Sequence, residues 1–125
     1  MQTLVSACPI EDVMRALSGR WPALLLYDLK QGTKRFRDLR RDNPTVSHRI
    51  LALELKKLEE VGLVSRTEHE GYPRHVDYAL TEAGRQLVPI IDGLADWWEA
   101  SAALRQSSAA PRASRSATSS GSSLN

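Results

Sequence analysis

The spacing of apolar residues changes in the middle of the chain, and this change restricts the folds open to it. Up to Gly62 the apolar residues recur at helical spacing, whereas residues 63–69 and 75–80 are typical of strands, the second with Val76, Tyr78 and Leu80 on one face. Helical spacing returns after Thr81. We therefore expect four helices, a β-hairpin and a last helix, which is a mainly helical α+β fold.

Prolines, glycines and capping residues indicate where these elements begin and end. The helix starts are Pro9, Pro22, Phe36, Ser47 and Thr81, and the stops are Ser18-Gly19, Gly32, Asp42-Asn43-Pro44 and Gly62. The second helix is apolar on most sides, so we expect it at the centre of the core, with Trp21 and Tyr78 as core aromatics. The fourth helix is expected to bury a stripe made of Ile50, Leu51, Leu55 and Leu58.

The net charge of +2 conceals a basic block in the middle of the chain. Between Lys30 and Lys57 there are nine basic residues against three acidic ones, whereas the segments on either side are acidic. A basic centre with acidic flanks is typical of a surface that binds a polyanion such as nucleic acid. A solvated helix face is the alternative that charge alone leaves open.

Length and composition restrict the class of protein. The 125 residues, 42% hydrophobic and 26% charged, suit one globular domain, which we place at residues 5–105. The serine-rich residues 106–125 are expected to form a disordered tail. No apolar run reaches the about 18 residues of a membrane span, and the N-terminus lacks the features of a signal peptide, so we expect a cytoplasmic protein.

Catalytic and metal-binding motifs are not recognised in the sequence. A single cysteine, Cys8, excludes an internal disulfide, and three scattered histidines argue against a histidine-based metal site. There is no Gly-rich phosphate loop and no nucleophile elbow. We expect neither an enzyme nor a bound cofactor.

The third and fourth helices, followed by the hairpin, indicate a winged helix-turn-helix. In this arrangement the second helix of the pair enters the major groove, and residues of its first turn reach the bases. Here those residues are Ser47, His48 and Arg49. A winged fold used only to bind other proteins is the alternative class.

The chain also resembles the HxlR-type winged-helix regulators of bacteria, over about Cys8 to Trp98. The resemblance rests on Cys8-Pro9, Gly19-Arg20-Trp21, Arg35-Phe36, Leu39, Val46-Ser47, Leu55, Leu58-Glu59, Gly62-Leu63-Val64, Arg66, Val76-Asp77-Tyr78, Leu80-Thr81 and Gly84. It implies a transcriptional regulator that binds a pseudo-palindromic operator in double-stranded DNA as a homodimer. In several members the cysteine corresponding to Cys8 responds to oxidants or electrophiles. The chain departs from the family pattern at Ala52, Leu53 and Pro73-Arg74-His75, which leaves the operator sequence open.

We expect three groups of functional residues. The DNA-binding group is Lys34, Arg35, Arg37, Arg40, Arg41, Ser47, His48, Arg49, Lys56, Arg74 and His75. The dimer interface is the last helix, through Leu87, Ile90, Ile91, Leu94, Trp97 and Trp98, together with the first helix; packing within one chain is the alternative. Cys8, at a helix start that favours a thiolate, is the expected redox-sensing residue, with an inert cysteine as the alternative.

Overall fold

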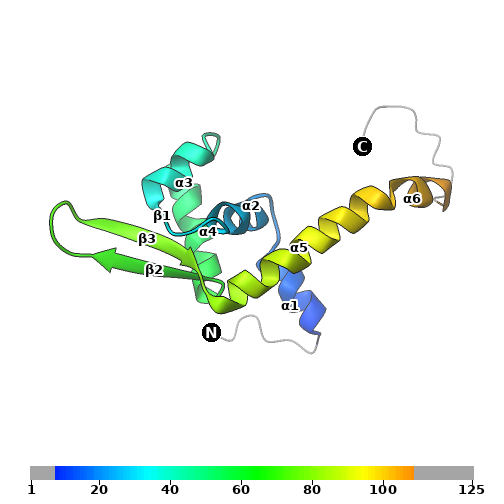
Figure 1. Ribbon diagram of the computed structural model, residues 1–125, viewed down its shortest axis with the longest axis horizontal. Coiled ribbons are helices and arrows are strands. Elements are labelled where there is room, and N and C mark those ends of the chain that lie inside the picture. The colour runs from blue at the N-terminus through cyan, green and yellow to red at the C-terminus, as the bar shows by residue number, and fades with distance from the viewer. Residues whose placement is uncertain (1–7, 109–125) are drawn as a thin grey trace. The chain divides into compact units, whose positions relative to one another are not determined.

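The computed structural model describes residues 8–108 and has the expected order of main elements (Figure 1). The first half contains α1 (Pro9–Ala16), α2 (Trp21–Leu29), β1 (Lys34–Arg35), α3 (Phe36–Asp42) and α4 (His48–Glu60). The second half contains β2 (Val64–His69), β3 (His75–Leu80), α5 (Glu82–Ala100) and α6 (Ala102–Ser108). The mainly helical fold with a hairpin is confirmed. The short elements β1 and α6 were not expected from the sequence.

The predicted boundary between the domain and its tail, after residue 105, falls within α6 (Ala102–Ser108). Helix α6 continues past residue 105 through Gln106 to Ser108, so these residues do not belong to an irregular tail. The rest of the expected tail, 109–125, and residues 5–7 of the expected domain lie outside the described residues. Among residues 8–108, no helix has the length and apolar character needed to cross a membrane.

The chain forms two compact units, Met1–Ile91 and Asp92–Asn125, and their boundary lies within α5. The first unit contains the hydrophobic core. The fully buried side chains come from α2, α3, α4 and β2: Leu25, Leu26, Leu29, Leu39, Leu51, Leu55, Leu58 and Val64. Tyr78 is buried as expected, and Trp21 packs half-buried against the same cluster.

Two apolar residues differ in burial from their neighbours in the predicted stripes, because adjacent helix positions face different directions. Ile50 was expected in the buried stripe of α4, but it is 36% exposed, whereas Leu51 is fully buried. Ile91 was expected on a dimer interface, but it lies in the core of its own chain with 9% exposure. Both residues stand at the edge of an apolar stripe, where the sequence alone does not fix the orientation of the helix.

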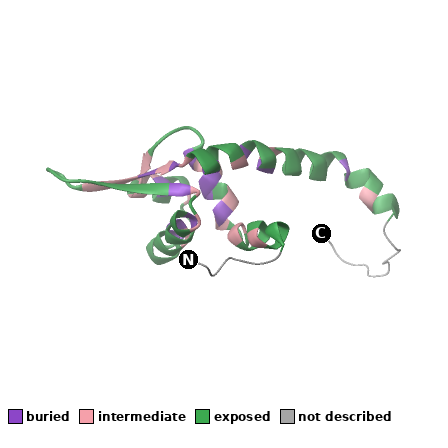
Figure 2. Cartoon of the chain, turned by 90° about the horizontal axis from the view of Figure 1, so that it is seen from below, coloured by how far each residue is buried: buried purple, intermediate pink, exposed green. Residues whose placement is uncertain are grey.

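The three strands form an antiparallel sheet in the order β1-β3-β2. The β2–β3 register runs from Val64 opposite Leu80 to His69 opposite His75, and β1 adds only two residues at the other edge of β3. In Figures 1 and 2 the hairpin extends away from the helices of the first unit, and its distal end is exposed. The hairpin is therefore a projecting arm with a buried base.

Thr81 and Gly84 join the hairpin to the start of α5. The Thr81 hydroxyl donates a hydrogen bond to the carbonyl of Gly62 at 2.6 Å and accepts one from the amide of Gly84 at 3.1 Å, so it caps the helix. Gly84 is buried, and a Cβ at this position would overlap the carbonyl oxygen of Leu63. The two residues thus fix α5 against the end of α4 and the start of β2.

The second unit contains the end of α5 and α6. The guanidinium of Arg105 lies 3.3 Å from the ring centroid of Trp98, and its Nε donates to the Ser101 hydroxyl at 3.0 Å. These contacts join the two helices across Ser101, which is buried. Within this unit Leu94, Trp97, Trp98 and Leu104 are each at least half-exposed.

Candidate functional site

The turn between α3 and α4 is fixed by buried and hydrogen-bonded groups. The Asn43 side-chain amide donates to the Asp28 carboxylate at 2.6 Å and to the Leu39 carbonyl at 2.9 Å, which ties the end of α3 to α2. Val46, in the same turn, is only 3% exposed. Because Asn43 is hydrogen-bonded to α2 and Val46 is buried in the core, these two residues position the first turn of α4.

The first turn of α4 presents polar side chains to solvent. The Ser47 hydroxyl accepts a hydrogen bond from the Ile50 amide at 3.0 Å, which confirms Ser47 as the N-cap. The His48 ring packs against Phe36 of α3, with centroids 4.7 Å apart. Arg49 is exposed. Of the three expected base-reading residues, Ser47 therefore has a capping role, His48 is held by α3, and Arg49 extends from the surface.

The expected basic residues fall into two groups according to their ion pairs. Lys34 binds the Asp42 carboxylate at 2.6 Å, and Arg41 binds Asp38 at 3.1 Å. By contrast, five exposed residues of the group form no ion pair with any carboxylate of residues 8–108: Arg37, Arg40, Arg49, Lys56 and Arg74. A cation that already faces a carboxylate attracts an added anion less strongly. The second group is thus the more favourable part of the surface for phosphate.

Asp38 also organises the start of α3. Its carboxylate accepts a hydrogen bond from the Arg35 amide at 3.3 Å, in addition to the ion pair with Arg41. Arg35 itself lies half-buried in β1, where it is paired with Asp77 of β3. Short as it is, β1 connects the base of the hairpin to the helix pair.

The hairpin carries the two remaining residues of the expected DNA-binding group. Arg74 is exposed near the turn, whereas His75 is half-buried and lies against His69 and Asp77. Farther along the hairpin, Glu68 accepts a hydrogen bond from Arg66, with the ion-pair atoms 2.9 Å apart, and this bond raises the pKa of Arg66. Arg66 therefore stays charged but faces a carboxylate of its own strand.

Cys8 lies where the sequence places it, at the N-cap of α1. Its carbonyl accepts a hydrogen bond from the Asp12 amide at 3.2 Å, and the residue is exposed. Glu11 and Asp12 occupy the first turn, and both form ion pairs with Arg15 at 3.7 Å.

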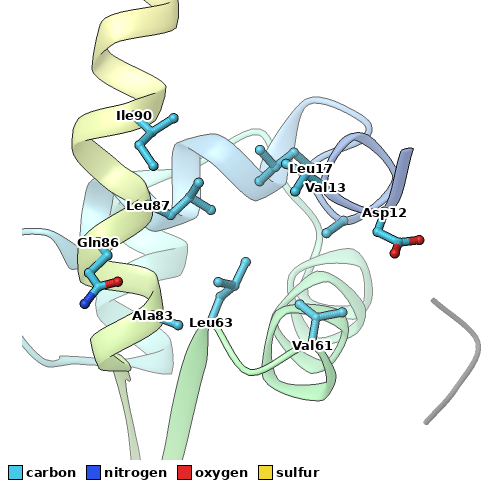
Figure 3. A pocket seen from close by; sticks show the side chains of 10 residues that line it. Asp12, Val13, Leu17, Val61, Leu63, Ala83, Gln86, Leu87 and Ile90 are labelled. Carbon is cyan, nitrogen blue, oxygen red and sulfur yellow. The ribbon is translucent and has the colours of Figure 1, made fainter. Parts of the chain in front are cut away.

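An apolar groove of about 400 Å³ lies between α1, the segment after α4 and the first half of α5 (Figure 3). Its walls include Val13 from α1, Leu17 directly after α1, Leu63, and Leu87 and Ile90 from α5. Leu87, one of the expected interface residues, is half-buried beside the core, whereas Ile90 is 60% exposed. The sequence did not reveal this groove, because its walls come from segments far apart in the chain.

Helices α3 and α4, the turn between them and the projecting β2–β3 hairpin together form a winged helix-turn-helix. The family described as HxlR-like helix-turn-helix matches residues 16–106. The chain therefore belongs to the HxlR-like helix-turn-helix family and is a transcriptional regulator of the helix-turn-helix type.

Individual relatives and solved structures agree with this assignment. The uncharacterized regulator YdeP of Bacillus subtilis is 40% identical over 92 residues, covering 74% of this chain and 72% of the relative. YtfH of Escherichia coli, also an uncharacterized regulator, is 41% identical over 92 residues, or 74% of this chain and 73% of the relative. The redox regulator HypR in its reduced form is 36% identical with a TM-score of 0.70, covering 80% of this chain and 99% of that one. Reduced YodB from B. subtilis is 33% identical with a TM-score of 0.69, covering 75% and 93%.

Proposed function

We propose that the protein binds a pseudo-palindromic operator as a homodimer, with the first turn of α4 in the major groove. The observation that carries this proposal is the exposed, capped start of α4, where Arg49 follows a turn that Asn43 joins to α2 by a hydrogen bond. An arginine at this position can donate two hydrogen bonds to the major-groove edge of one guanine, at its O6 and N7 atoms. Arg49 is thus the main candidate for reading the sequence.

The other exposed cations suit the DNA backbone. Arg37 and Arg40 lie on α3, the helix expected to cross the backbone, and Arg74 lies near the hairpin turn. Phosphate contacts position a protein on the duplex and supply most of its salt-dependent affinity. We assign these three arginines to positioning rather than to base recognition.

Exposed apolar residues support the homodimer. Helix α1 has no buried residue, and Ile10, Met14 and Ile90 are each about half-exposed or more, at 67%, 49% and 60%. Leu94, Trp97 and Trp98 of the second unit are exposed as well. Apolar surface of this kind generally marks an interface. Ile91 is not included in the proposed interface because it lies in the core.

Footprinting on the DNA that flanks the gene, combined with sedimentation, tests the proposal. We expect a protected sequence with two related half-sites about 10 base pairs or a multiple apart, and a dimer at micromolar concentration. A protected site without internal symmetry, or a monomer that binds it, would contradict the operator model.

We further propose that Cys8 makes DNA binding sensitive to oxidants or electrophiles. The structural likeness to HypR, a redox regulator, and to YodB, whose diamide-treated form has also been solved, supports this. Three products are open: a Cys8-to-Cys8 disulfide, a mixed disulfide with a small thiol, or an alkylated thioether. In the first, two thiols lose two protons and two electrons to the oxidant, and their Cα atoms must come within about 7 Å.

Operator affinity before and after diamide separates a reactive Cys8 from an inert one. We expect diamide to weaken binding by the wild-type protein and to leave Cys8→Ser unchanged, because the variant has no thiol. Non-reducing electrophoresis and mass spectrometry identify the product. Equal loss of affinity in both proteins would show that the oxidant acts elsewhere.

A further inference from the structure

Two of the three histidines of the chain meet an aspartate on one face of the β2–β3 hairpin. His69 pairs with His75 in the register, and Asp77 lies two residues farther along β3 on the same face. The two imidazole rings stack with their centroids 4.6 Å apart. One ligand atom from each of the three residues lies within 4.8 Å of the others. We propose that this cluster, the hairpin triad, binds one divalent ion of the zinc class.

Both imidazoles direct Nε2 at the same carboxylate. Nε2 of His69 lies 2.8 Å from one oxygen of Asp77, and Nε2 of His75 lies 3.7 Å from the other. Two imidazole nitrogens and a carboxylate oxygen are a donor set that zinc binds, at about 2.0–2.2 Å. Ligand atoms around a tetrahedral ion at such distances lie about 3.3 Å apart. A movement of about an ångström through side-chain rotation therefore brings the triad to coordinating geometry.

The surroundings of His75 favour the form of the ring that binds a metal. Its Nδ1 lies 3.5 Å from the carbonyl oxygen of Pro73, which only a protonated Nδ1 can satisfy. In a neutral ring Nε2 then carries a lone pair, and this lone pair faces the Asp77 carboxylate. A ring nitrogen that donates to a backbone carbonyl is the usual support of a metal-binding histidine.

The triad is accessible and leaves room for another ligand. The exposed fractions of the side chains are 44% for His69, 27% for His75 and 21% for Asp77. Three protein ligands leave the fourth position of a tetrahedral ion for water or another group. The sequence argued against such a site because the histidines are scattered; strand pairing across the turn brings two of them together.

A bound ion changes the charge of the hairpin. Residues 64–80 contain two arginines against three carboxylates, so the arm is formally negative when its histidines are neutral. One divalent ion makes it positive, which favours contact with phosphate. This consequence rests on the proposed DNA-binding function, whereas the ion site itself does not.

Calorimetric titration of the untagged full chain with zinc chloride, without DNA, tests the site. We expect one ion per chain in the wild type, and affinity at least about tenfold weaker in His69→Gln, His75→Gln and Asp77→Asn, because each variant removes one ligand. His48→Gln and Cys8→Ser are the matched controls and should bind like the wild type. A dissociation constant weaker than about 100 μM, or equal affinity in the triad variants, would overturn the site.

Imidazole NMR signals test the same site in the wild-type chain, so the result does not depend on whether a variant folds. Added zinc should shift the ring signals of His69 and His75 in a saturable manner and leave those of His48 in place. A saturable shift at His48 alone, or no saturable shift at any of the three, would contradict the triad.

Binding to random-sequence duplex DNA tests whether the bound ion strengthens contact between the hairpin and phosphate. Zinc at saturating concentration should raise the affinity of the wild type severalfold and should not change that of Asp77→Asn. An equal response in both proteins would overturn the role of the ion in DNA contact. Absence of DNA binding by the metal-free wild type at low salt would instead count against the proposed function, while the calorimetry would still decide the ion site.

Discussion

At the scale of single residues, Arg49 and Arg40 should differ in how they affect DNA binding. We expect Arg49→Ala to cost about 1–3 kcal/mol at the operator and to relax the preference for one base, because it removes a base contact. Arg40→Ala should weaken binding to all sequences alike and lower the salt slope by about one, because it removes a phosphate contact. Affinities of both variants for operator and random duplex, measured across a salt series, distinguish these effects. An unchanged operator affinity in Arg49→Ala would show that Arg49 does not contact a base in the major groove.

Gly84 is the residue whose size matters most at the base of the hairpin. A Cβ here would overlap the Leu63 carbonyl, so Gly84→Ala should destabilise the fold by about 1–3 kcal/mol through overpacking. Gly93→Ala, in the same helix, meets no atom within 4 Å and should be neutral or stabilising by up to about 1 kcal/mol. Denaturant unfolding of both variants provides the comparison. A Gly84→Ala protein as stable as the wild type would show that α5 can shift away from β2.

At the scale of elements, the first turn of α5 contains a pH-sensitive contact. Glu82 accepts hydrogen bonds from Arg85 at 3.1 Å and from Gln86 at 3.3 Å, which lower its pKa below the ordinary 4.5. Because the folded-state pKa is the lower one, the ionised carboxylate stabilises the fold above pH 4.5, and this contribution is lost as the pH falls through the lowered value.

Glu82→Gln should therefore melt slightly below the wild type at neutral pH, and the difference should shrink once the pH falls below 4.5. The effect is small because the side chain is exposed. Glu70→Gln is the control, since Glu70 forms no ion pair within residues 8–108. Melting temperatures of the wild type and both variants, measured from neutral to acidic pH, provide the test. A difference between Glu82→Gln and the wild type that grows on acidification would contradict the lowered pKa of Glu82.

At the scale of the whole molecule, a charge placed on the proposed interface should separate the protomers. Ile90 is 60% exposed in one chain, so Ile90→Glu should fold normally but sediment as a monomer, because the carboxylate would be buried between protomers. Leu53→Glu, a similar change at a residue 48% exposed on α4, should remain dimeric. If Ile90→Glu sediments like the wild type, α5 does not form the interface at this position.

The sequence by itself determined the order of the main elements and most of their ends. Apolar periodicity, the cap at Ser47 and the prolines and glycines at helix ends act over a few neighbouring residues, so they can be read locally. The same local signals identified the start of α4 as the candidate DNA-reading element. The resemblance to HxlR-type regulators, now confirmed, added the class of function.

The tertiary structure decided which positions on each element are buried and which distant residues meet. In the folded chain Ile50 is exposed and Ile91 is buried. Lys34 is paired with a carboxylate, whereas cations such as Arg49 are exposed. The tertiary structure also formed the groove between α1 and α5 and brought His69 beside Asp77. These arrangements depend on how helices rotate against a shared core and on which residues pair across strands. Both are set by contacts between distant segments, which local sequence patterns do not specify.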